Sequence, residues 1–348
     1  MKRATRFLAL AAFLATSTAA LAQTACDYTA PTPLKAGAQA DIATAKYDGG
    51  KIRIAYLPMG TEFNYHVALS EGIKSVAAAS EGVESFLLSP YSGSDLAGQM
   101  GMLQDVTAQA DVDAIILISF DEHALAPLVK EAVNAGKVVV IINSDIPDFP
   151  TPVHGVIGVN QRKVNAELAK WAQKRDGGEA RNVGILDGEP GYLATERAGG
   201  FTDGIEGSNW TVSARINGGW SVEKGNTAAM DLIQANPGVQ VIYASNDYMA
   251  LGAALAAKAL GRSDLEIYGY DGDTGALENV AAGEGITATT DTSPVIMGRQ
   301  AACFVIDLLR NRKQGGYVNT PTRIVSKDNA VEVLKKAQDL FPQPAKAY

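Results

Sequence analysis

The chain is poor in the side chains that most often bind metal ions or act as nucleophiles. Its 348 residues include two cysteines, Cys26 and Cys303, and three histidines, His66, His123 and His154. They form neither a Cys-x-x-Cys nor a His-x-x-x-His pair, so the sequence predicts no structural zinc site. A Walker-type loop and a dinucleotide-binding glycine fingerprint are also missing, so we expect no cofactor.

Basic residues are outnumbered by acidic ones. Lys and Arg total 30, Asp and Glu total 38, and the formal net charge is −8 at pH 7. This balance argues against nucleic acid as a partner, because proteins that bind nucleic acid need a basic face. The hydrophobic content of 47% is enough for sizeable cores, and the length allows two domains.

Long hydrophobic runs are lacking except near the start of the chain. Met1–Ala22 has a basic beginning, the apolar run Phe7–Leu14 and an Ala-Leu-Ala ending. This pattern is typical of a secretory signal, so we expect cleavage before Gln23 and a protein that functions outside the cytoplasm. The apolar run is too short to span a bilayer. A lipid anchor at Cys26 is disfavoured, and the other interpretation of the run is a short buried helix.

The two cysteines admit two interpretations. In an oxidising compartment such a pair is often joined in a disulfide, and Cys303 lies in a segment with the periodicity of an amphipathic helix. A Cys26–Cys303 bridge would attach the N-terminal arm, residues 23–46, to that helix. The alternative is one buried thiol and one exposed thiol.

After the irregular arm, apolar runs of strand length alternate with segments of helical periodicity. The predicted strands are Ile52–Leu57, Ser85–Leu88, Ala114–Ile118, Val138–Ile142, Val153–Val159, Val183–Leu186, Val212–Ile216, Val241–Ala244, Ile267–Tyr270 and Ile286–Thr290. The predicted helices are His66–Ser80, Asp95–Gln109, Ala124–Asn134, Arg162–Arg175, Ala194–Gly207, Lys224–Asn236, Tyr248–Leu260, Thr274–Ala282 and Val295–Arg310. Strands that are apolar throughout and separated by helices predict parallel sheets covered on both faces. Because the pattern restarts near residue 160, we predict an α/β protein with two doubly wound, parallel-sheet lobes.

Polar and aromatic side chains follow nearly every predicted strand. Ligands of doubly wound sheets bind outside the carboxyl ends of the strands. Examples of what stands there are Phe63-Asn-Tyr-His66, Asn143-Ser-Asp145, Asp187–Tyr192 and Ser245-Asn-Asp247. Aromatic faces cover apolar C–H patches, while Asp and Asn exchange hydrogen bonds with hydroxyl groups. The sequence therefore predicts a small polyhydroxylated ligand.

Three segments carry a resemblance to a known family. Val241–Gly252 is similar to a strand followed by Asn-Asp-x-Met-Ala-x-Gly, Tyr268–Gly272 to Gly-Phe-Asp-Gly, and Glu196–Phe201 to Glu-Arg-x-x-Gly-Phe. In their order along the chain and at this spacing, the three segments resemble those of the type I periplasmic sugar-binding proteins of ABC transporters, the ribose- and galactose-binding branch. The resemblance extends from about Lys51 to Ser326. It implies two lobes joined by a hinge of three crossovers, with the ligand held in the cleft between them.

The resemblance also implies a domain organisation and a role. The first lobe would comprise residues 47–159 and 293–321, and the second residues 160–292 and 322–348. The protein would be a monomeric, non-enzymatic receptor of the periplasm that binds a small sugar or polyol, closes on it and delivers it to the membrane permease of an ABC importer.

Ligand-binding positions are implied by the same resemblance. Asn246 and Asp271 match sugar-binding positions, Trp220 matches an aromatic residue of the cleft, and Thr195 stands in the place of a sugar-binding Arg. The other implied positions are Phe63 or Asn64 in place of an Asn, Tyr65 and His66 as stacking aromatics, Asn143 and Asp145 near a sugar-binding Asp, Tyr192 in a loop after a strand, and Asp291 and Thr292 where Gln is frequent.

Structural roles are the alternative for several of these residues. Asp271 and Asn246 could each cap the helix that follows, although we assign Asn246 to the ligand and Asp247 to a cap or another structural role. We expect Arg197 to hold its own helix and loop in place, and His66 could also be structural.

The chain departs from the family pattern in charge. The two arginines usual in the cleft are not expected here, whereas Glu62, Asp145, Glu189 and Asp291 add acidity. An amine-bearing or cationic ligand is therefore the alternative to a neutral one. The alternative role is a periplasmic sensor subunit that reports its ligand to a membrane histidine kinase. A glycosidase and a cytoplasmic repressor are disfavoured, because no catalytic constellation or helix-turn-helix segment is evident.

Overall fold

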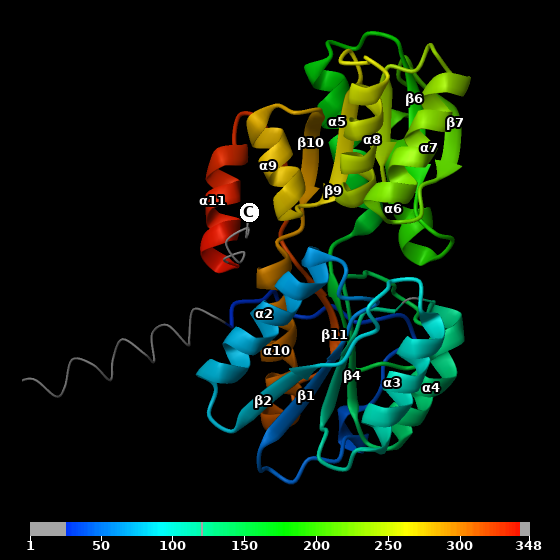
Figure 1. Ribbon diagram of the computed structural model, residues 1–348. Helices are drawn as coiled ribbons and strands as arrows, with labels where there is room; N and C mark the ends of the chain where they lie inside the picture. The colour runs from blue at the N-terminus through cyan, green and yellow to red at the C-terminus, as the bar shows by residue number, and fades with distance from the viewer. Residues whose placement is uncertain (1–25, 120, 342–348) are drawn as a thin grey trace, which may run out of the picture.

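The protein folds into two α/β lobes, one above the other in Figure 1. The computed structural model describes residues 26–119 and 121–341, so the predicted signal segment Met1–Ala22 and its cleavage position lie outside the described residues. Each lobe contains a six-stranded sheet, with the order β11-β5-β4-β3-β1-β2 in the first and β12-β10-β9-β8-β6-β7 in the second.

The first lobe, lower in Figure 1, takes its strands from two separate parts of the chain. They are β1 (Ile52–Leu57), β2 (Val83–Leu87), β3 (Ala114–Leu117), β4 (Val138–Ile142), β5 (Gly155–Gly158) and β11 (Gly316–Asn319). Its helices are α2 (Asn64–Ala79), α3 (Leu96–Ala108), α4 (Glu122–Asn134) and α10 (Pro294–Asn311), with a short 3-10 turn, η1 (Ile42–Thr44), in the arm.

The second lobe has the same layered arrangement. Its strands are β6 (Arg181–Asp187), β7 (Trp210–Asn217), β8 (Val241–Ala244), β9 (Glu266–Asp271), β10 (Ile286–Asp291) and β12 (Arg323–Ser326). Its helices are α5 (Gln161–Arg175), α6 (Tyr192–Ile205), α7 (Val222–Ala235), α8 (Asp247–Ala259), α9 (Thr274–Ala282) and α11 (Ala330–Leu340). Among the described helices, none has both the length and the apolar content needed to cross a bilayer.

The chain passes between the lobes at three places. The crossovers lie between β5 and α5, between β10 and α10, and between β11 and β12. The named strands pair in parallel except β12, which is antiparallel to β10. The prediction of two parallel-sheet α/β lobes is confirmed, and each predicted strand or helix ends within 2 residues of its observed bounds. The sequence analysis missed β11, β12 and α11.

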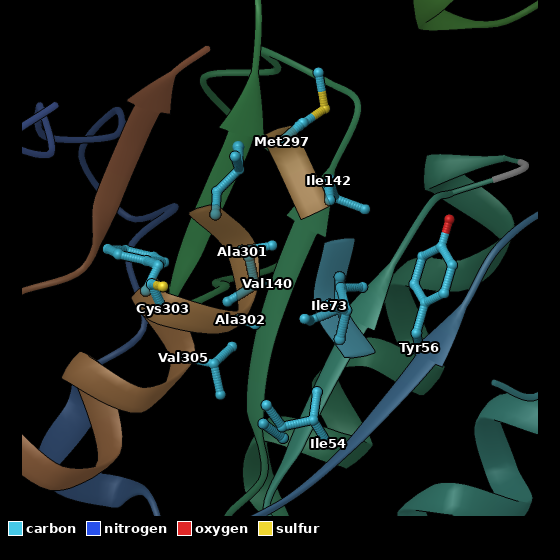
Figure 2. Close-up of a cluster of buried hydrophobic side chains, with 14 of the residues drawn as sticks. Ile54, Tyr56, Ile73, Val140, Ile142, Met297, Ala301, Ala302, Cys303 and Val305 are labelled. Carbon is cyan, nitrogen blue, oxygen red and sulfur yellow. The ribbon is translucent and has the colours of Figure 1, made fainter. Parts of the chain in front are cut away.

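Alternate residues of the central strands pack against helices on opposite faces of the sheet. In the first lobe, Val140 and Ile142 of β4 belong to the core formed with α2 and α10. Figure 2 shows this core, with Ile73 of α2 and Met297 of α10 beside the strands. Val139 and Ile141 pack on the other face, in the core that includes residues of α3 and α4. Burial on both faces explains why β4 is apolar throughout.

The backbones of helices α2 and α10 pack directly against each other at two glycines, Gly72 and Gly298. A Cβ atom added to Gly72 would lie 2.2 Å from the carbonyl oxygen of Val295, and one added to Gly298 would lie 2.1 Å from that of Leu69. Larger side chains would therefore force the helices apart. Because α10 begins directly after the second crossover, this packing fixes that end of the hinge to the first lobe.

A disulfide joins the N-terminal arm to α10. Cys26 is bonded to Cys303 with a Cα–Cα distance of 5.3 Å, which is the first of the two interpretations of the cysteine pair. Nearby, the Tyr28 hydroxyl donates to the carboxylate of Asp307, and Thr32 forms an antiparallel bridge with Tyr317 of β11. Cross-linking residues far apart in sequence restricts the unfolded chain, which stabilises the fold by about 2–5 kcal/mol in typical proteins.

Candidate functional site

A cavity lies between the lobes, at the carboxyl ends of strands from both sheets. It encloses about 730 Å³ of space unoccupied by protein atoms, part of it open to solvent. The first lobe lines it with Met59, Phe63, Tyr65, His66, Ser119, Glu122 and Asn143. The second lobe lines it with residues 189–194, Arg197, Trp220, Asn246, Tyr248 and Asp271.

An ion pair between Arg197 and Asp271 lies on the second-lobe side of the cavity. Arg197, on α6, is only 2% exposed, and its Nη1 atom lies 3.2 Å from Oδ1 of Asp271. The guanidinium also donates to Gln161 Oε1 at 2.9 Å and to the Ser245 carbonyl at 3.0 Å. Its Nη2 atom and Asp271 Oδ1 are buried without a hydrogen-bond partner among the described residues. Nη2 can therefore donate a further hydrogen bond, and Oδ1 can accept one.

The Arg197 guanidinium is also held between aromatic rings. It lies 4.2 Å from the ring centroid of Tyr270 and 5.5 Å from that of Trp220. Burial raises the pKa of Asp271 to about 7, although the positive charge of Arg197 acts in the opposite direction. The ion pair is therefore fixed in orientation by its surroundings and is poorly hydrated.

Three residues of the cavity have a backbone conformation that L-amino acids rarely adopt. The φ angle is +62° at Asn143, +61° at Trp220 and +129° at Asp271. Such conformations cost on the order of 1–3 kcal/mol each and cluster at functional sites. The fold thus sustains backbone strain at three positions where a side chain faces the cavity.

Trp220 has a fixed place against the loop after β6. Its ring lies over Gly188, where an added Cβ would come within 1.9 Å of a ring carbon. The side chain of Asn246 donates to the Trp220 carbonyl at 3.0 Å and also accepts from the backbone N–H of Met249 at 2.9 Å. Asn246 therefore caps α8, which is the structural alternative that the sequence analysis named for it, and it also lines the cavity.

Asp247 has a different structural role. Its buried carboxylate accepts from the backbone N–H groups of Gly272 and Asp273, each at 2.8 Å. Asp273 rather than Asp271 caps α9, so the Asp271 carboxylate is left to face Arg197 and the cavity.

On the first-lobe side the cavity has aromatic rings and neutral polar groups. The Tyr65 hydroxyl lies 3.1 Å from Asn143 Oδ1 and 2.7 Å from the hydroxyl of Thr292. Thr292 lies in the second crossover and bonds to the Asp271 carbonyl at 2.9 Å. Burial lowers the pKa of His66 to about 4, so its imidazole is neutral at pH 7 and its Nδ1–H donates to Gly60 O at 2.8 Å.

Two tyrosines of the second lobe reach across to the first lobe. The hydroxyl of Tyr248 accepts from the backbone N–H of Asn64 at 2.7 Å. The hydroxyl of Tyr192 donates to Oδ1 of Asp145 at 3.2 Å. The lobes are thus in direct contact beside the cavity.

The remaining carboxylates of the cavity differ in their partners. Glu189 accepts from Asn217 at 2.8 Å and pairs with Lys224 at 3.3 Å. Glu122 begins α4, and no partner for its carboxylate occurs among the described residues. No group of three or more His, Cys, Asp or Glu side chains in the described part of the chain is arranged to hold a metal ion.

The structure brings together most of the residues that the sequence analysis implied for the site. Those that line the cavity are Phe63, Tyr65, His66, Asn143, Tyr192, Trp220, Asn246 and Asp271. Those that do not line it are Asn64, Asp145, Thr195, Asp291 and Thr292.

The residues outside the cavity have other contacts. Thr195 is exposed. Asp291 pairs with Arg323 at 2.9 Å and accepts from the N–H of Ser293. Asn64, Asp145 and Thr292 take part in the contacts between lobes or in the hinge described above.

Residues that the sequence analysis did not assign to the ligand also line the cavity, above all Arg197, Tyr248 and Glu122. Contrary to the expectation of a cleft without arginine, Arg197 places its guanidinium there. A signal existed in the sequence: Leu193, Ala194 and Arg197 lie at helical spacing on one face of α6, directly after a strand. Whether that face meets the cleft depends on how α6 is oriented.

Known proteins resemble this chain along most of its length. The family model described as "Periplasmic binding protein domain" matches residues 54–313. The D-ribose/D-allose-binding protein of Pseudomonas aeruginosa is 30% identical over 246 residues, which cover 67% of this chain and 75% of that protein. The ribose import binding protein RbsB of Bacillus subtilis is 26% identical over 260 residues, which cover 75% of this chain and 82% of that protein.

Solved structures share the fold. A solute binding protein of an ABC transporter from Mycobacterium smegmatis, with bound glycerol, superposes with a TM-score of 0.74 at 26% identity and covers 81% of this chain and 96% of that one. A solute binding protein from Bacillus halodurans, with bound myo-inositol, superposes with a TM-score of 0.75 at 21% identity and covers 84% of this chain and all of that one.

Proposed function

This chain belongs to the periplasmic binding protein family, in its type I sugar-binding branch, and we propose that it binds a small neutral sugar or polyol between its lobes for an ABC importer. The relatives are periplasmic solute-binding components of such importers and not enzymes. On this proposal the lobes close on the ligand, and the loaded protein is recognised by a membrane permease.

The observation that carries this proposal is the Arg197–Asp271 pair. Nη2 of Arg197 has no acceptor among the described residues, and Oδ1 of Asp271, which faces Nη1 of Arg197 at 3.2 Å, can accept a further hydrogen bond. Both residues are buried at the cavity. A hydroxyl group both donates and accepts, so neighbouring hydroxyls of one ligand can satisfy both atoms. The rings of Trp220 and Tyr65 offer apolar faces for its C–H groups. Because the pair is already balanced in charge, a neutral ligand fits it without leaving a buried charge unpaired.

The relatives suggest which polyols to test. They include a D-ribose/D-allose-binding protein and solute binding proteins with bound glycerol and with bound myo-inositol. We propose calorimetric titration of the protein, beginning at the proposed mature residue Gln23, with D-ribose, D-allose, myo-inositol and glycerol. A compound present at a free concentration of 100 times its Kd stabilises the fold by about 2.7 kcal/mol, so a thermal-shift measurement provides an independent readout.

A matched pair of variants tests the site. Arg197→Lys removes Nη2 and the planar guanidinium and should abolish titration of the compound that binds. Thr195→Ala changes an exposed residue of the same helix and should bind as the unaltered protein does. Unimpaired binding by Arg197→Lys would refute this site. Size-exclusion chromatography checks the monomer, and mass spectrometry of the exported protein checks cleavage before Gln23.

A cationic ligand is the second candidate, and it is favoured by the carboxylate of Glu122. The panel therefore also includes the amines glucosamine and choline. If an amine binds and no neutral compound does, and if Glu122→Gln abolishes this binding, the ligand class is a cation and not a neutral polyol. Deletion of the gene separates transport from a sensory role: the importer predicts loss of growth on the solute, and the sensor predicts loss of induction alone.

We divide the lobes at residues 47–159 with 293–321 and at residues 160–292 with 322–348. Sheet membership supports this division, because β1–β5 and β11 belong to one sheet and β6–β10 and β12 to the other.

A further inference from the structure

Tyr248 joins the two lobes without the help of a ligand. Its hydroxyl, at the start of α8 in the second lobe, accepts from the backbone N–H of Asn64 in the first lobe at 2.7 Å. The hydroxyl also interacts with the Asp273 carboxylate of its own lobe. The Tyr248 ring meets that of Phe63 edge to face, with centroids 5.4 Å apart. One side chain thus connects a charged group of the second lobe to a backbone donor of the first.

Tyr192 makes a second junction from a different strand end. It begins α6, after β6, and donates to Asp145, which follows β4. Asp145 also accepts from the backbone N–H of Gln161, the residue that begins α5 directly after the first crossover. In the first sheet, β3 separates β4 from β1, so the two junctions leave from strands that are not neighbours.

Both junctions require the lobes to be close together. Both tyrosines line the cavity, but the groups that their hydroxyls bond, the Asn64 backbone and the Asp145 carboxylate, do not. A hydrogen bond between two protein groups of different lobes forms on closing and is lost on opening, whichever ligand is present. Such a bond raises the fraction of molecules in the closed form, and the apparent affinity rises by the same factor for every ligand that binds this form.

We propose that Tyr192 and Tyr248 are positioning residues that set the strength of binding by holding the lobes closed, while selectivity belongs to the residues around Arg197 and Asp271. This inference rests on the proposed function, because it assumes a ligand bound between the lobes. It differs from a direct binding role in one measurable respect: the ratio of affinities for two ligands is unaffected by either hydroxyl.

The test uses Tyr192→Phe and Tyr248→Phe, which remove only the hydroxyl groups. A hydrogen bond contributes about 0.5–1.5 kcal/mol net, which corresponds to a roughly two- to tenfold weaker Kd. Titration with the two tightest-binding compounds among D-ribose, D-allose, myo-inositol and glycerol should show this loss for both compounds, with their Kd ratio unchanged. Tyr91→Phe, in a side chain that is 81% exposed, is the matched control and should leave both Kd values unchanged.

A double-mutant cycle assigns the effect of Tyr192 to its partner. If the Tyr192–Asp145 bond is responsible, Asp145→Ala weakens binding as well, and Tyr192→Phe adds nothing further in its presence. Additive losses, or a changed ratio of the two Kd values, would overturn the proposal in favour of direct ligand contact.

Small-angle X-ray scattering without added ligand keeps the proposal testable even if no panel compound binds. We expect a larger radius of gyration for each Phe variant and for the pair than for the unaltered protein and Tyr91→Phe. Equal radii in all five proteins would refute the closing role, whereas a failed titration with altered radii would refute only the choice of ligand.

Discussion

The two lobes present different chemistry to the cavity between them. On the second-lobe side, Arg197 and Asp271 form a buried ion pair, and Asn246 holds the loop of Trp220. On the first-lobe side, Tyr65 and the neutral His66 stand beside Asn143, and one carboxylate, Glu122, has no partner among the described residues. The ion-paired groups are thus fixed by contacts within the second lobe, and the first lobe contributes mainly aromatic rings and neutral polar groups.

On the proposed function, this difference predicts how the two lobes divide the contacts to the ligand. Groups already oriented in the second lobe lose little freedom when they meet a ligand. A ligand can therefore bind first to the second lobe and gain contacts to the first lobe on closing. If this division holds, damage to the second-lobe face should cost more than equivalent damage to the first.

The largest effect is expected from Asp271→Ala. This change leaves Arg197 charged and unpaired at 2% exposure, which typically destabilises a protein by about 3–5 kcal/mol. Urea unfolding should show this loss, and titration should show no binding. The control is Asp187→Ala, which breaks a more exposed pair with Arg215 and should cost at most about 1 kcal/mol. Equal losses in the two variants would contradict the special position of the Arg197 pair.

Gly188→Ala should have the next largest effect. Its Cβ would lie 1.9 Å from the Trp220 ring, so the ring must move, at a cost of about 1–3 kcal/mol. We expect at least tenfold weaker binding, measured by titration and by a change in tryptophan fluorescence. In Gly101→Ala, whose Cβ meets nothing within 4 Å, affinity should be unchanged and α3 slightly stabilised. An unaltered fluorescence spectrum in Gly188→Ala would show that the ring does not depend on this glycine.

Tyr65→Phe tests the first-lobe face and should have a smaller effect. The lost hydroxyl lies within hydrogen-bonding distance of Asn143 and Thr292, and a buried group left without a partner costs about 1–3 kcal/mol. We expect a loss of stability at the low end of this range and weaker binding. Tyr47→Phe, which removes an exposed hydrogen bond to Gly50, is the control. If Tyr65→Phe loses more affinity than Gly188→Ala, the first-lobe face contributes more to binding than the second-lobe face, contrary to the expected order.

The smallest effect concerns pH and Asp145. Burial raises the pKa of Asp145 to about 6, and the nearby negative charge of Glu196 raises it as well. The hydrogen bonds from Gln161 and Tyr192 lower this pKa but do not offset burial. Tyr317 and Asp148 are the other titratable groups on this side. If opening returns the pKa toward its ordinary value near 4, the closed form binds more protons between pH 4 and 6. Affinity should then fall as the pH rises through about 6 and stay constant above it.

Asp145→Asn isolates this contribution, because other groups of the cleft titrate as well. The difference in log Kd between the unaltered protein and Asp145→Asn should grow from pH 4 to about 6 and then level. A difference independent of pH would show that the pKa of Asp145 does not change on closing.

Much of the fold could be predicted because its strands are buried on both faces. A strand such as Val138–Ile142 is apolar at every position, and helix starts and stops flank it. The missed strands β11 and β12 have 4 residues each and include exposed positions, so neither periodicity nor apolar content marks them. Their pairing is decided by the crossovers that bring them beside β5 and β10.

The candidate site was predictable only in part. Residues that follow strands were found because sheet topology places strand ends together. Which of Asn246 and Asp247 caps α8 could not be foreseen, because either side chain can accept a hydrogen bond from a helix N-terminus. The backbone donors of Gly272 and Asp273 decide it, since they bind the Asp247 carboxylate.

The sequence alone determined the alternation of strands and helices, the presence of two lobes and the polar character of the strand ends, since these follow from local periodicity and from which residues can be buried. The tertiary structure alone decided that Arg197 meets Asp271, that Cys26 is bonded to Cys303, and that Tyr192 and Tyr248 touch the opposite lobe. Each of these contacts joins residues distant in the chain. Their proximity depends on how whole layers pack, and no local pattern of side chains encodes it.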